Sequence, residues 1–115
     1  MEGIKINILG TEYTIIKQSE EENPKLEGKF GYTEPYSKKI ILDAKLGIPD
    51  KEKDSAERQD LFANKVLRHE LIHAFFVESG LNDNCDYATN EELVDWIAAQ
   101  FPRMLEVFNK LEVVD

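Results

Sequence analysis

Two histidines and a glutamate stand at a spacing that suits metal chemistry. His69, Glu70 and His73 form the pattern HExxH within residues 66–77, where Arg68 is the only other polar residue. On an α-helix, residues four apart share a face with Cβ atoms about 6 Å apart, so both imidazoles can reach one ion at the roughly 2.0–2.1 Å that zinc requires. Glu70 would lie beside that ion, where its carboxylate can take a proton from a water molecule. The chain has no other histidine, and a ligand pair is favoured over two unrelated core or surface histidines.

A third ligand has to come from elsewhere, because a catalytic zinc site usually has three protein ligands and one open position. Glu91 and Asp95 are four apart and would share one helix face. Glu91 could bind the metal, while Asp95 accepts a hydrogen bond from the far nitrogen of a ligand histidine. Glu92 is the competing ligand, but it stands at capping-box spacing from Thr89, which favours Glu91. The alternative is that Glu91 and Asp95 only stabilise a helix N-terminus through the helix dipole.

The first half of the chain has the alternating pattern of β-strands. Residues 4–8 and 13–16 predict one hairpin, and residues 29–33 and 39–42 predict a second strand pair. Residues 47–50 contain glycine and proline and are expected to end the β-rich part.

The HExxH pattern is expected on a long helix. Asp54 and Glu57 have capping-box spacing at its start, and Gly80 follows its predicted last residue, Ser79. Because residues 66–77 are apolar nearly all round, this part of the helix is predicted to be buried.

A second helix is expected after a polar loop at residues 81–88. Thr89 and Glu92 would cap it, and Pro102 would kink or interrupt it. Its apolar positions recur at helical spacing at Leu93, Ile97, Phe101, Leu105 and Phe108.

Together these elements predict a single α+β domain spanning residues 1–115, β-rich over 1–50 and helical over 54–115. We expect a small antiparallel or mixed sheet packed on two main helices. The net charge of −9 argues against nucleic-acid binding. No segment has the length and apolarity of a membrane span or signal peptide, and a single cysteine, Cys85, fits a reducing cytoplasm.

The segment HELIH at residues 69–73, followed by NEELVD at residues 90–95 with Glu91 18 residues after His73, resembles the gluzincin pattern HExxH then NExxxD of thermolysin-like peptidases. This resemblance implies that His69, His73 and Glu91 bind one Zn²⁺, that Glu70 is the general base and that Asp95 supports a ligand. A short chain with β-hairpins ahead of the HExxH helix also resembles the ImmA/IrrE and SprT-like metallopeptidases of phages and mobile elements. That likeness implies a minimal zincin-like fold and a cytoplasmic protein or peptide substrate, such as a regulator.

The sequence departs from larger gluzincins in having no third histidine and no large second subdomain. Tyr32, Tyr36 and Tyr87 are candidates to stabilise an oxyanion, with ordinary strand or loop packing as the alternative. An extended substrate is expected to pair with an edge strand, either residues 29–33 or residues 39–42. The alternative function is a zinc-stabilised interaction module with weak or no catalysis. Glu70 favours the enzyme, and the absent histidine favours the module.

Overall fold

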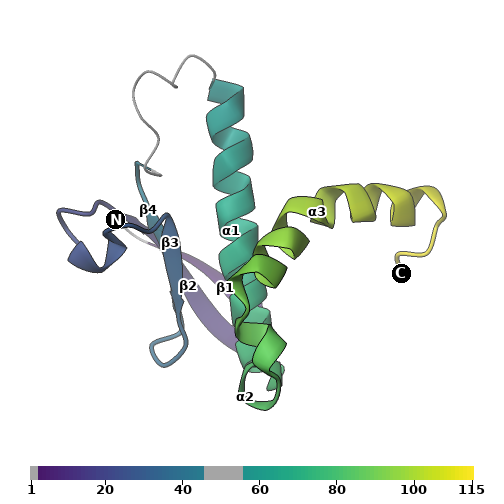
Figure 1. The fold of residues 1–115 in the computed structure, drawn as a ribbon, viewed down its shortest axis with the longest axis horizontal. Helices are drawn as coiled ribbons and strands as arrows, with labels where there is room; N and C mark the ends of the chain where they lie inside the picture. Colours follow the sequence, from purple (N-terminus) through teal and green to yellow (C-terminus); the bar gives the residue numbers. More distant parts are fainter. Residues whose placement is uncertain (1–2, 46–55) are drawn as a thin grey trace.

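The computed structural model describes residues 3–45 and 56–115 and forms an α+β fold (Figure 1). Its strands are β1 (Ile4–Ile8), β2 (Thr11–Gln18), β3 (Gly31–Glu34) and β4 (Lys39–Asp43). Its helices are α1 (Ala56–Glu78), the single turn α2 (Leu81–Asn84) and α3 (Glu91–Lys110), with 3-10 turns η1 (Pro24–Leu26) and η3 (Asp86–Thr89). The predicted fold class is confirmed. The predicted helix start at Asp54 and the predicted end of the β-rich part at 47–50 lie outside the described residues.

The sheet is mixed, with strand order β1-β2-β4-β3. Both predicted antiparallel pairs form, β1 with β2 and β3 with β4. The β1–β2 turn consists of Leu9 and Gly10, which both have positive φ angles, as a two-residue hairpin of type I′ requires. The chain then reaches the far edge as β3 and returns as β4, which lies between β3 and β2 and runs parallel to β2.

The central position of β4 corrects one expectation. Residues 39–42 cannot offer an open strand edge to a substrate, because β4 is hydrogen-bonded to a neighbour on each side. Its side chains Ile40, Ile41 and Leu42 are all buried, as a strand in the middle of a covered sheet requires. Of the two proposed strands, only β3 lies at an edge of the sheet.

Helix α1 packs against the sheet and also contacts α3 (Figure 1). The core between α1 and the sheet consists of the buried residues Ile8, Tyr13, Ile40, Leu42, Val66 and Ala74. The helix is therefore buried along one face only, and the expectation of burial nearly all round is wrong: Phe75 remains 44% exposed. The helix ends at Glu78, one residue before the predicted last residue Ser79, and Gly80, the predicted stop, follows in the left-handed conformation.

The segment after α1 is more ordered than the predicted polar loop. Residues 81–88 form α2 and most of η3, and Ala88 in η3 is fully buried. The predicted capping box is also wrong, because the N-cap of α3 is Asn90, whose side chain accepts a hydrogen bond from the amide of Leu93 at 2.8 Å. The hydroxyl of Thr89 instead donates to the carbonyl of Asp86.

Helix α3 is continuous through Pro102 and bends in its middle (Figure 1). Its fully buried residues are Val94 and Ala98, whereas Phe101 and Phe108 of the predicted apolar series remain nearly half exposed. The second half of the helix extends away from the rest of the domain (Figure 1). Among the described residues, no helix combines the length and apolarity needed to cross a membrane.

Candidate metal centre

The two histidines of α1 point to one place. Because they are four residues apart on a regular helix, their imidazole rings lie side by side, with centroids 4.9 Å apart. The two Nε2 atoms are 3.2 Å apart. Both side chains are largely buried, with 15% of His69 and 17% of His73 exposed.

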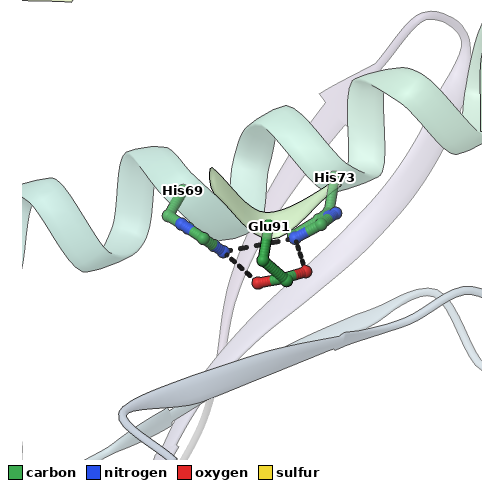
Figure 2. A group of neighbouring side chains, drawn as sticks. All are labelled: His69, His73 and Glu91. Carbon is green, nitrogen blue, oxygen red and sulfur yellow. Dashed lines mark hydrogen bonds and ion pairs between the residues drawn. The ribbon is translucent and has the colours of Figure 1, made fainter. Parts of the chain in front are cut away.

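Glu91, the first residue of α3, brings its carboxylate to the same two nitrogens (Figure 2). One oxygen lies 3.0 Å from Nε2 of His69, and the other lies 2.8 Å from Nε2 of His73. Ligand atoms at 2.0–2.1 Å from a tetrahedral ion are separated by about 3.4 Å, so these contacts are close to the edges of such a coordination shell. The three residues could hold a metal ion, since their ligand atoms all lie within 4.8 Å of one another.

Asp95 lies behind the histidine pair, one helical turn beyond Glu91. One of its oxygens is 3.4 Å from Nδ1 of His69, and the other is 3.2 Å from the ammonium of Lys65. A proton on Nδ1 shared with Asp95 would leave Nε2 of His69 free to bind a metal. Asp95 therefore lies beside the far ring nitrogen of His69 and has Lys65 as an additional partner.

Glu70 follows His69 on α1, lines the same hollows as the histidines and is only 6% exposed. The hydroxyl of Thr33, on the edge strand β3, is 2.9 Å from a Glu70 carboxylate oxygen and 2.9 Å from the Glu70 backbone carbonyl. Burial raises the pKa of Glu70, while the Thr33 hydrogen bond and the nearby histidines oppose that rise. The net rise makes Glu70 a stronger base than an exposed glutamate.

Two shallow hollows flank this cluster, with volumes of about 360 and 390 Å³. Both are lined by Lys29, Gly31, Glu70 and Glu91, so they adjoin the edge strand β3 and the histidine cluster together. Of the three tyrosines considered above, Tyr32 lines the second hollow, and its hydroxyl accepts a hydrogen bond from the amide of Asn23 at 2.7 Å. The structure does not bring the other two to either hollow; Tyr36 is 99% exposed and Tyr87 is 55% exposed.

Three residues that support the cluster were not found from the sequence: Thr33, Lys65 and Arg68. The Nε–H of Arg68 donates to the backbone carbonyl of Ala98 at 2.7 Å and joins α1 to α3. This bond fixes the helix that carries Glu91 relative to the helix that carries the histidines. Arg68 did stand out in the sequence as the one other polar residue near the pattern, whereas Thr33 and Lys65 carried no such signal.

A scan against known protein families finds no match to this chain, and searches of curated proteins and of solved structures find no significant similarity either.

Proposed function

We propose that this chain is a zinc-dependent metallopeptidase of the gluzincin type, which cuts a peptide bond in a protein partner. The observation that carries the proposal is the convergence of two histidine nitrogens and the Glu91 carboxylate, with Glu70 adjacent. His69, His73 and Glu91 would hold Zn²⁺, since two imidazoles and one carboxylate are a donor set typical of catalytic zinc. Zinc in such a site supplies a Lewis acid and lowers the pKa of a water molecule to about 7.

Residues of this chain would then transfer the protons and position the reacting groups. Glu70 takes a proton from the attacking water and delivers it to the leaving amine. The water oxygen would first bond to the carbonyl carbon, and the carbon–nitrogen bond would then break as the C=O bond reforms and the amine takes the proton from Glu70. Thr33 holds Glu70 in place, and Asp95 keeps His69 in the tautomer whose Nε2 faces the metal.

The edge strand β3 is the proposed docking place for an extended substrate. Its free edge adjoins both hollows, so a peptide paired with β3 would pass close to Glu70. The hollows are too small and shallow to enclose several consecutive substrate side chains. This favours a protein partner that makes further contacts outside them. A net charge of −9 favours neutral or basic segments over acidic ones. We therefore propose narrow endoproteolysis of a cytoplasmic regulator, of phage or mobile-element origin, rather than general digestion.

The test separates metal binding from chemistry. Zinc content of purified wild type should be one ion per chain, and His69→Ala or His73→Ala should each lose it. Glu70→Gln should keep zinc and reduce hydrolysis by a factor of at least about 10². Casein, a mixed peptide library and regulators encoded beside the gene are the substrates to compare. An unchanged zinc content in either histidine variant would contradict the proposed metal site. Peptide cleavage by Glu70→Gln at the wild-type rate would contradict the role of Glu70 as the base.

One observation favours a second function, a zinc-stabilised interaction module. The Glu70 carboxylate is already hydrogen-bonded to Thr33 and joins β3 to α1, which is a structural use for the residue. Under this alternative, the zinc-loaded chain would bind a regulator without cutting it. Rapid and indiscriminate casein digestion would instead exclude both the module and the narrow specificity.

A further inference from the structure

The second half of α3 is amphipathic, and its apolar face is open. Its apolar residues recur every three or four positions and lie within one face of the helix: Phe101, Met104, Leu105, Val107, Phe108 and Leu111. The opposite face carries polar and charged residues such as Arg103, Glu106 and Asn109. Val107 is 54% exposed and Leu111 is 67% exposed, so the described residues leave much of this face uncovered. We call residues 104–111 the arm.

An apolar groove lies at the base of the arm, between α1 and α3. It has a volume of about 340 Å³ and is lined mainly by Leu71, Ile72, Phe75, Phe76, Ile97 and Phe101. Arg68 is the one charged residue at its wall, and its Nε–H is turned to the carbonyl of Ala98. Phe101 belongs both to the groove and to the apolar face that continues along the arm, so the two form one surface.

We propose that two copies of this chain associate through this surface, with the arm of each copy lying in the groove of the other. A twofold dimer requires one patch that is complementary to itself. This patch meets that requirement because it carries both a protruding apolar helix and an apolar hollow. The inference does not depend on the proposed peptidase activity, since none of His69, Glu70, His73 and Glu91 lines the arm or the groove.

The exposed area is sufficient for such an interface. The exposed apolar side chains of the arm and groove are Phe75, Phe101, Met104, Val107, Phe108 and Leu111. Together they present roughly 550 Å² per copy, about two thirds of the roughly 800 Å² that each partner buries in an interface of standard size, and about the apolar share of a homodimer interface. This area is at the upper end of the largest apolar patches that monomers leave in water, and patches of that size are often functional.

The charge of the arm does not oppose a second copy. Residues 104–111 contain Lys110 against Glu106, a net charge of 0. The net charge of −9 of the whole chain therefore lies in the remaining residues. The arm avoids the repulsion that two copies of this acidic chain experience elsewhere.

Sedimentation velocity over a concentration series tests the proposal. Wild type should pass from monomer to dimer, and Phe108→Asp should weaken the association at least about tenfold. Asn109→Asp is the matched control, because it adds the same charge at the next residue on the polar face and should leave the association unchanged. Circular dichroism and thermal unfolding check the fold of each variant. Val107→Asp makes the same test at a more exposed position if Phe108→Asp fails to fold.

Phe75→Asp tests the groove independently and should also weaken the dimer at least about tenfold. A wild type that stays monomeric up to about 1 mM would overturn the proposal. So would equal association of Phe108→Asp and Asn109→Asp. A monomer that co-floats with phosphatidylcholine vesicles would overturn it too and would assign the apolar face to a lipid surface.

Discussion

Glu78, the last residue of α1, joins the helix to the sheet through three hydrogen bonds. Its carboxylate accepts from the hydroxyl of Thr11 at 2.8 Å, the hydroxyl of Tyr13 at 2.7 Å and the ammonium of Lys38 at 2.8 Å. An acidic residue at a helix C-terminus is normally unfavourable because of the helix dipole. Here the three donors outweigh that cost. We predict that Glu78→Gln destabilises the fold and does so only where the carboxylate is ionised.

The size of the effect follows from the pKa of Glu78. The Lys38 hydrogen bond, followed by those of Tyr13 and Thr11, lowers this pKa from 4.5 to about 2. A difference of this size corresponds by linkage to about 3 kcal/mol of stability at neutral pH. The Lys38 side chain is 39% exposed, so water screens its part of the interaction. We therefore expect Glu78→Gln to cost about 1–2 kcal/mol at pH 7.

The stabilisation by Glu78 should decrease as the pH falls. Because the folded pKa lies below the unfolded value, the stabilisation is fully present above about pH 4.5 and is lost as the pH falls towards 2. Urea unfolding of metal-free protein at pH 7 and near pH 2 measures it. Glu20→Gln removes the same charge from an exposed turn and serves as control. Equal stability of wild type and Glu78→Gln at pH 7, or a difference that persists unchanged near pH 2, would refute this reasoning.

Three further predictions concern the metal centre. Glu91→Ala should abolish tight zinc binding in calorimetry, whereas Glu92→Ala should leave it unchanged and cost at most about 0.5 kcal/mol of helix stability; the reverse pattern would move the ligand to Glu92. Asp95→Asn should weaken zinc affinity about 10–100-fold, and an unaltered affinity would remove its supporting role. Thr33→Val should destabilise the fold by about 1–2 kcal/mol in urea unfolding, because Glu70 loses its donor, and Thr33→Ser should restore stability; equal stability of the two variants would contradict the hydrogen bond.

The strands could be predicted from local pattern, but their order in the sheet could not. Alternating apolar residues identified both antiparallel pairs, since each pair is close in sequence. The parallel pairing of β2 with β4 joins strands separated by β3 and depends on tertiary packing. One local sign of it was present: Ile40, Ile41 and Leu42 are three consecutive apolar residues, as expected of a strand covered on both sides.

The metal centre likewise has a part that could be predicted from the sequence and a part that could not. His69, Glu70 and His73 lie on one helix, so regular geometry alone predicts how they are arranged. Thr33 and Lys65 reach the centre through contacts between elements, which no spacing along the chain encodes. The burial pattern of α1 was mispredicted because Phe75 and its apolar neighbours face a groove rather than the sheet. Apolar composition does not distinguish a core from an uncovered surface.

Glu91 was favoured over Glu92 on a premise that the structure does not support. The premise was a capping box between Thr89 and Glu92, whereas Asn90 is the cap. Residues of an α-helix are about 100° apart around its axis, so the residue that faces α1 depends on where the helix begins. With Asn90 as cap, Glu91 and Asp95 lie one turn apart and both reach His69, on its two ring nitrogens. The hydrogen bond from the Leu93 amide to the Asn90 side chain thus helps to set which glutamate faces the histidines.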